Sequence, residues 1–264
     1  VEPDTPGNIR LGDRSAKSGY ELVKGGTVVK LIERLTYPTA FDANFVADLF
    51  LTYRSFLSPT KLLQLLLSRF SVTDEQVDGK ATVIRLRVCN ALLHWIERHY
   101  YDFETSPLLR RRVIRFIQDE LPASDMRGKD TLAAKLARAL EAQTLLHKLR
   151  RYQTRQAAVT SRLREVGGLV VENALSTMMN TAAPPAPILP PHLGSDTSQY
   201  RFNLLDWSPL ELARQLCLIE FDIFRRIQPR ECLNQAWMRA RKEEEAPNLT
   251  ALIRRFNALS HWLT

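Results

Sequence analysis

The sequence has few cysteines and no long apolar run. Its three cysteines, Cys89, Cys217 and Cys232, are odd in number and lack the spacing of a metal site. We interpret them as buried, reduced thiols of a cytoplasmic protein. No apolar run reaches the roughly 18 residues that a membrane span needs, because even the densest stretch, residues 62–67, contains Gln64. These absences argue against a disulfide-rich secreted domain and against an integral membrane protein.

The sequence also lacks the motifs of covalent enzyme chemistry. No Gly-Lys-Ser or Gly-Lys-Thr follows Gly25-Gly26, so this pair is not a phosphate loop. The five histidines show no metal spacing, and no serine stands in a nucleophile signature. We therefore predict no enzyme activity, no catalytic residue, no metal ion and no cofactor.

Positive charge is concentrated in one part of the chain. The formal net charge is +8, and residues 110–165 alone hold fourteen Lys or Arg against six Asp or Glu. A basic surface attracts nucleic acid, anionic lipid or acidic protein. We expect no nucleic-acid partner, because the basic stretch has no recognisable binding motif. The favoured interpretation is a solvated helix face packed on the domain before it; the alternative is an amphipathic helix on an anionic membrane surface.

Apolar residues recur at helical spacing over most of the chain, and no strand-rich segment is evident. Thr27 and Asp42 are suited to cap helices, and a Ser-Pro pair stands at positions 58, 106 and 208. A polar loop with Gly79 separates two of the expected helices. The sequence therefore predicts an all-α fold. Before residue 200, the expected helices cover residues 27–35, 42–53, 58–70, 81–99, 106–120 and 131–166.

The most specific stretch begins at Ser208. Ser208 and Glu211 have the spacing of a capping box, and Pro209 suits the first helical position. Pro229 ends the helix or opens a second short one. We expect the apolar face of this helix to be core. That face consists of Leu212, Leu216, Ile219, Ile223 and Ile227, spaced three or four residues apart.

Composition divides the chain into four parts. Residues 1–19 are rich in Gly, Pro, Ser and charge, which predicts a disordered lead-in. Residues 178–200 contain five prolines, which is typical of a semi-rigid linker. We expect a helical domain with a basic helical extension over residues 20–177, and a second helical region over residues 201–264.

Two stretches resemble parts of one known family. Residues 208–224, with the run Ile-Gln-Pro-Arg-Glu-Cys-Leu from Ile227 and with Trp237, closely resemble the opening of the catalytic domain of Ras-family guanine-nucleotide exchange factors. Residues 24–120 resemble the Ras exchanger motif, the all-helical module that precedes this domain. The runs that carry the second resemblance are residues 26–27, 31–36, 41–45, 51–56, 84–90, 94–97 and 101–103.

The resemblance implies a noncovalent function. An exchange factor binds a small GTPase of the Ras family and prefers its nucleotide-free state, so the nucleotide leaves faster. In the family, a helical hairpin that follows the opening helices wedges into the GTPase. The sequence ends at Thr264 within an apolar helical pattern, so we expect a truncated start of the catalytic domain. On this expectation, the 264 residues alone accelerate no exchange and leave apolar helix faces uncovered.

Three residues are candidates for a GTPase contact distant from the catalytic domain's own site. Some members of the family bind a second GTPase between the exchanger motif and the catalytic domain, and the matching positions here are Leu86, Arg87 and Trp237. Arg87 would pair with an acidic switch region and Trp237 would supply an apolar anchor. The alternative, which we favour, places Leu86 and Trp237 in a domain interface and Arg87 in a surface salt bridge.

A second function remains open at this stage. The chain could be a noncatalytic module that binds a GTPase without exchange, or one that stabilises or inhibits a separate catalytic chain. The expected location is the cytoplasm in either case, with recruitment to a membrane if the basic helix binds lipid.

Overall fold

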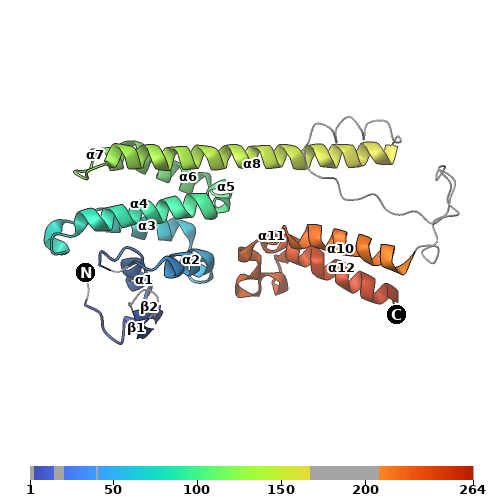
Figure 1. Cartoon of the computed structure of the whole chain (residues 1–264), viewed down its shortest axis with the longest axis horizontal. Helices are drawn as coiled ribbons and strands as arrows, with labels where there is room; N and C mark the ends of the chain where they lie inside the picture. The colour runs from blue at the N-terminus through green and yellow to red at the C-terminus, as the bar shows by residue number, and fades with distance from the viewer. Residues whose placement is uncertain (1–2, 15–20, 40, 167–207, 264) are drawn as a thin grey trace. The chain divides into compact units, whose positions relative to one another are not determined.

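Helices form most of the chain, as the sequence predicts. The computed structural model describes residues 3–14, 21–39, 41–166 and 208–263. The chain divides into two units, Val1–Val159 and Thr160–Thr264, here called unit 1 and unit 2 (Figure 1). The proline-rich linker predicted at residues 178–200 lies outside the described residues, as do the predicted boundaries at residues 177 and 201.

A small hairpin corrects the prediction of a disordered lead-in over residues 1–19. Strand β1 (Ile9–Arg14) pairs antiparallel with β2 (Glu21–Gly26), and Ile9 is opposite Gly26. A side chain on Gly26 would lie 2.9 Å from the backbone oxygen of Asn8, so this glycine permits the close approach of the two strands. Composition concealed the strand because its apolar residues are few and its bulges interrupt the alternation.

Ion pairs attach the residues before the hairpin to the first helix. Helix α1 (Val28–Leu35) carries Lys30, whose ammonium group is buried and lies 3.0 Å from an Asp4 oxygen and 2.8 Å from Glu33. Arg34 pairs with the other oxygen of Asp4. These carboxylates raise the pKa of Lys30 although burial opposes the charge. The contacts explain why part of a polar, proline-containing segment is ordered.

The helices of unit 1 begin where the sequence predicts. Thr27, Asp42, Ser58 and Ser106 each accept a backbone N–H of the first turn of the helix that follows. The loop before α4 turns at Gly79, whose φ of 73° is left-handed. The helices after α1 are α2 (Ala43–Thr52), η1 (Tyr53–Ser55), α3 (Pro59–Phe70), η2 (Asp74–Gln76) and α4 (Ala81–Arg98).

The next part of unit 1 is more broken than the sequence predicts. The expected single helix over residues 106–120 is α6 (Pro107–Arg115) followed by a π-helical turn, η3 (Phe116–Glu120). Pro122 lies in the following short helix α7 (Leu121–Ala123). Proline has no backbone N–H to donate to the preceding turn, and that turn is the wider π-helical one. Helix α5 (Tyr101–Thr105) was not predicted, because it is too short to show a periodic pattern.

A buried carboxylate joins three helical segments of unit 1. Asp102 on α5 accepts hydrogen bonds from the Tyr53 hydroxyl at 2.6 Å, the Trp95 indole N–H at 2.7 Å and Arg54 Nε at 2.9 Å. Arg54 also pairs with it through a terminal nitrogen. Because these hydrogen bonds and the ion pair satisfy the carboxylate oxygens, the negative charge of Asp102 is tolerated in the interior. The surrounding core contains the fully buried rings of Phe50, Trp95 and Phe103.

The long basic helix α8 (Lys129–Val166) begins two residues before the predicted Thr131. Leu136 and Leu140 are buried in the core of unit 1, which is the packing that the sequence analysis favoured. Figure 1 shows α8 running alongside α4, α5 and α6. The hydroxyl groups of Tyr100 and Thr144 form a hydrogen bond of 2.7 Å across this contact. Association of the helix with a membrane is untested and stays a prediction.

Unit 2 consists of two longer helices with short helices between them. These are α10 (Pro209–Phe224), η5 (Pro229–Met238), α11 (Lys242–Glu245) and α12 (Pro247–Leu263). Helix α10 packs against α12, and the short helices sit at one end of the pair (Figure 1). Pro229 opens η5, which is one of the two outcomes that the sequence allows.

Two predictions about unit 2 are wrong in detail. Ser208 makes no side-chain cap, and the buried Glu211 carboxylate instead accepts from Arg214 and Gln215 at 3.0 and 2.8 Å. The expected core face of α10 is only partly covered: Leu212, Leu216, Ile223 and Ile227 are half-buried, and Ile219 is exposed. Periodicity identifies the apolar face of a helix but does not show how much of that face is covered.

The cysteine prediction holds for one thiol of the three. Cys89 is buried in the core of unit 1, and burial raises the pKa of its thiol to about 12. Cys217 and Cys232 are free but exposed. Among the described residues, no group of His, Cys, Asp or Glu side chains has the arrangement of a metal site.

Candidate functional site

The exposed face of α4 presents two of the predicted contact residues. Leu86 is 41% exposed and Val83, one turn earlier, is 40% exposed, whereas Ile84 and Val88 of the same helix are buried. The residues at i and i+3 share a helix face. Leu86 therefore lies on the surface of unit 1 and not in its core.

Arg87 belongs to the same surface. Its guanidinium lies 4.6 Å from the centre of the Phe41 ring, a cation–π contact, and Phe41 is itself exposed. Its Nε is buried and has no hydrogen-bond partner within the described part of the chain. The structure gives Arg87 no acidic partner among these residues, so the expected surface salt bridge is absent there. We call the set of Phe41, Val83, Leu86 and Arg87 the α4 patch.

Trp237 lies on η5 in unit 2, where it is half-buried. The backbone before it is irregular: Leu233 is extended, and Asn234 and Gln235 have φ of 51° and 55°. Beside it in sequence, Ala236 is buried and Met238 is 71% exposed. The α4 patch lies in unit 1 and Trp237 lies in unit 2, so each is described by itself.

A buried glutamate that the sequence analysis did not single out holds this part of unit 2 together. Glu231 is 1% exposed and accepts the backbone N–H groups of Asn248 and Leu249 at 2.9 and 3.0 Å. It also accepts from the Asn248 amide and from the N–H of Gln228. A carboxylate at this point satisfies the first turn of α12 and opposes the positive end of its dipole. The three-residue spacing of Gln228 and Glu231 is the signal that could have revealed it.

The largest exposed apolar side chains of unit 2 lie on its two longer helices. Phe221 and Phe224 on α10 are 63% and 62% exposed, and Phe256 on α12 is 66% exposed. Leu210 at the start of α10 is also largely exposed. Exposed apolar groups of this size favour contact with another surface. We call these four residues the α10–α12 face.

The strongly shifted titratable groups of unit 1 belong to its core. Burial lowers the pKa of His99 to about 4, with Arg54 adding to the effect, and burial also lowers the pKa of His94. Both rings stack around the buried Phe50. Burial is the first cause of both shifts, so they reflect packing. Within the described ranges, no helix combines the length and apolar character needed to cross a membrane.

Comparisons with known families assign both units. Residues 22–116 match the family model of the RasGEF N-terminal motif, and residues 211–264 match that of the RasGEF domain. The two matches together cover more than half of the chain. The α4 patch and the Asp102 carboxylate lie in the first match, and Trp237 and the α10–α12 face lie almost wholly in the second.

Curated relatives agree with the family models. Ras guanine nucleotide exchange factor A of Dictyostelium discoideum is 30% identical over 92% of this chain and 34% of its own length. Protein son of sevenless of Drosophila melanogaster is 28% identical over 99% of this chain, and Son of sevenless homolog of Caenorhabditis elegans is 25% identical over all of it. The chain spans 16% and 21% of those two relatives.

The order of the two matched regions along the chain is the one that the resemblance implies, and both regions are helical. The chain therefore belongs to the Ras guanine-nucleotide exchange factor family and carries its N-terminal motif together with residues of its RasGEF domain.

Proposed function

We propose that this chain is part of a guanine-nucleotide exchange factor for a Ras-family GTPase, in which unit 1 is the structural and regulatory module. We further propose that residues 1–264 do not accelerate exchange by themselves. The observation that carries both proposals is the α10–α12 face, whose aromatic side chains are uncovered within the region that matches the RasGEF domain.

The exposed side chains of this face have an energetic cost. Burying a large apolar side chain contributes about 1.5–3 kcal/mol relative to leaving it exposed. Phe221, Phe224 and Phe256 gain only a fraction of that contribution in this chain, because each is more than 60% exposed. We infer that further RasGEF residues cover them in a working exchange factor. The helices that would separate nucleotide from GTPase then rest on α10 and α12.

The role of unit 1 follows from its closed core. Its buried charges are paired, as at Asp102, and its strongly shifted histidines are part of the packing. Such a body supplies rigidity and a surface but no covalent chemistry. This division of roles includes the domain limits expected from the sequence: a helical module over residues 20–177, a linker over residues 178–200 and a RasGEF region over residues 201–264.

A nucleotide-release assay tests the proposal. Ras, Rap and Ral proteins loaded with fluorescent GDP are mixed with residues 1–264 and an excess of unlabelled nucleotide. We expect the intrinsic release rate with each GTPase. We expect faster release when the chain is continued by the RasGEF residues that follow the aligned part of Dictyostelium Ras guanine nucleotide exchange factor A. Fast release with residues 1–264 alone would show that exchange does not require further residues to cover the α10–α12 face.

The α4 patch favours a second candidate function, GTPase binding without exchange. It combines three exposed apolar side chains with a cation that has no acidic partner among the described residues. Such mixed surfaces are suited to a partner with an acidic group beside an apolar one. Trp237 is the corresponding candidate in unit 2. On this proposal Arg87 pairs with an acidic region of the GTPase.

Binding measurements separate this candidate from the first. A panel of Ras-family GTPases, each loaded with a GTP analogue, loaded with GDP or stripped of nucleotide, is titrated with residues 1–264. We expect binding to one nucleotide state, weakened at least tenfold by Arg87→Ala or Leu86→Ala. Arg98→Ala, an exposed change on the same helix, is the matched control and leaves binding unchanged. If all three substitutions changed the affinity for the GTPase equally, the α4 patch would not be the binding surface.

A further inference from the structure

A groove between α6 and α8 has the features of a ligand site. It has a volume of about 400 Å³, and a second hollow of about 350 Å³ continues it toward α5. The two hollows share Arg110 and Ile114 on α6 and Thr144 and Lys148 on α8. Pockets for small molecules commonly have about 300–1,000 Å³ and are mostly apolar with a few polar groups.

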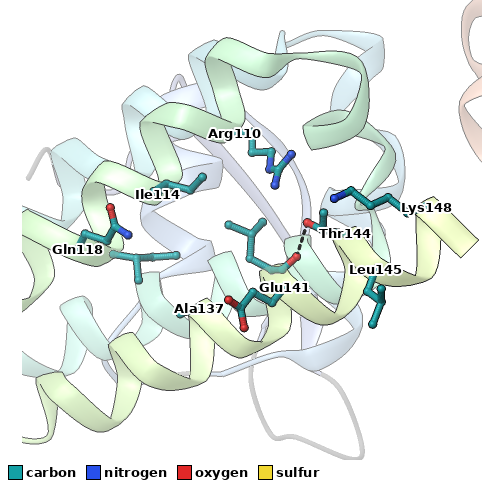
Figure 2. A pocket seen from close by; sticks show the side chains of 10 residues that line it. Arg110, Ile114, Gln118, Ala137, Glu141, Thr144, Leu145 and Lys148 are labelled. Atoms are coloured by element: carbon teal, nitrogen blue, oxygen red, sulfur yellow. Dashed lines mark hydrogen bonds between the residues drawn. The ribbon is translucent and has the colours of Figure 1, made fainter.

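The floor of this groove is apolar. Ile114 and Ile117 line it from one side, and Ala137 and Leu140 line it from α8. Leu140 is mostly buried, and the Thr144 hydroxyl donates to its carbonyl oxygen at 2.6 Å (Figure 2). Because Thr144 also bonds to Tyr100, its hydroxyl is already satisfied. The floor is therefore suited to an apolar chain.

Two cations stand over this floor from opposite walls. Figure 2 shows the side chains of Arg110 and Lys148 reaching toward each other above Thr144. Neither has an acidic partner among the described residues, and Arg110 Nε is buried without a hydrogen bond. The nearby Glu104 carboxylate is already occupied, since it bonds to His147 at 2.9 Å and lies 3.8 Å from Arg151.

The charge of the groove indicates how much negative charge a ligand brings. Glu141 also lines the groove, and in Figure 2 it extends toward Ala137, away from the two cations. With Arg110, Lys148 and Glu141, the larger hollow has a net charge of one positive unit. A guanidinium binds a carboxylate through two parallel hydrogen bonds, and an ammonium adds a point charge. Arg111, Arg151 and Glu104 line the adjoining hollow, so the groove as a whole is positive and suits an anion. A planar carboxylate matches the guanidinium fork.

We propose that the α6–α8 groove binds a free acyl carboxylate, with the carboxylate between Arg110 and Lys148 and the acyl chain over Ile114, Ile117 and Leu140. This ligand is independent of the GTPase and of the RasGEF region, because every residue of the groove lies in unit 1. Binding would join α6 to α8 through the anion.

Calorimetric titration of residues 1–264 with decanoate tests the proposal. We expect saturable binding of one decanoate per chain at concentrations below those at which decanoate aggregates. Acetate, which has the carboxylate alone, and decyltrimethylammonium, which has the opposite charge, are expected not to bind. Heat that appears only above the aggregation concentration, or equal binding of the cationic amphiphile, would overturn the proposal.

Variants locate the site. Arg110→Met and Lys148→Met remove a charge while keeping side-chain length, and we expect each to weaken decanoate binding at least tenfold. Arg138→Met, an exposed change on α8 outside the groove, is the control. Lys148 is exposed, so its substitution leaves folding intact even if that of Arg110 does not. Equal affinity of the Lys148→Met and Arg138→Met variants would contradict the assignment, as would binding of an acidic helical peptide without binding of decanoate.

Discussion

The two units differ in how completely they bury their apolar residues. In unit 1, large side chains such as Phe50, Trp95 and Phe103 are fully enclosed, and a buried carboxylate is satisfied by four donors. In unit 2, Phe221, Phe224 and Phe256 of α10 and α12 are mostly exposed, although the buried Glu231 joins η5 to the start of α12. A helix pair with good local connections but an uncovered face is a platform for another surface. In the described residues, the core of unit 1 is enclosed, whereas α10 and α12 of unit 2 keep exposed aromatic side chains.

The largest expected effect on this contrast is the loss of Asp102. Asp102→Ala leaves Arg54, Tyr53 and Trp95 buried with unpaired donors, and breaking a buried ion pair costs about 3–5 kcal/mol. We expect the free energy of unfolding of unit 1 to fall by that amount in urea denaturation followed by tryptophan fluorescence. Glu97→Ala, an exposed change on α4, is the control and is expected to stay within about 0.5 kcal/mol. A small effect of Asp102→Ala would mean that the carboxylate network does not stabilise unit 1.

The next comparison sets a covered side chain against an uncovered one. Leu66→Ala in unit 1 removes a fully buried side chain and is expected to cost about 2–5 kcal/mol. Phe221→Ala in unit 2 removes a larger side chain that is 63% exposed, and we expect a change within about 0.5 kcal/mol. Thermal unfolding of both variants measures the difference. Similar losses from both would show that unit 2 is as fully packed as unit 1.

The pH dependence of stability tests the core of unit 1. His99 has a folded-state pKa of about 4, below the ordinary value of 6.5, so the unfolded chain binds the proton more tightly. Its contribution to stability is therefore intact above pH 6.5 and is lost as pH falls toward 4, by about 3 kcal/mol at most. Chemical denaturation between pH 7 and 4 measures this loss. His99→Gln is expected to flatten the curve in this window, and an unchanged slope would contradict the burial of a neutral His99.

Glu231 provides the corresponding test within unit 2, with a smaller expected effect. Glu231→Ala leaves the first N–H groups of α12 without their acceptor, at a cost of about 1–3 kcal/mol. We expect faster amide hydrogen exchange at the start of α12 and no change in α4. The exposed change Glu244→Ala in α11 is the control. If amide exchange were slower throughout α12 than in α4, unit 2 would be the more stable unit. That result, in the wild-type chain or in the variant, would contradict the order of stability proposed for the two units.

Local signals predicted much of this architecture, and tertiary contacts decided the rest. Thr27, Asp42, Ser58 and Ser106 fixed helix starts because a cap depends on a few neighbouring residues. A cap was also predicted at Ser208, but its side chain caps no helix, and Glu211 accepts hydrogen bonds from Arg214 and Gln215. The hairpin was missed because its apolar residues are few and its bulges interrupt the alternation. The residues before it are held by ion pairs of Asp4 with Lys30 and Arg34, which are far away in sequence.

The candidate site shows the same division. The resemblance selected Leu86 and Arg87, and both lie on one exposed face of α4. It did not reveal Phe41 as the ring beneath Arg87, because that contact joins a loop to a helix more than forty residues later.

Amide hydrogen exchange, compared between residues 1–264 and the same chain continued by RasGEF residues of a relative, tests the central claim most directly. We expect strong and equal protection of α4 in both proteins. We expect weak protection of α10 and α12 in residues 1–264 and a gain of at least tenfold in the longer protein, together with loss of dye binding to exposed apolar surface. Equal protection of α10 and α12 in the two proteins would contradict the claim that unit 2 is completed by further RasGEF residues.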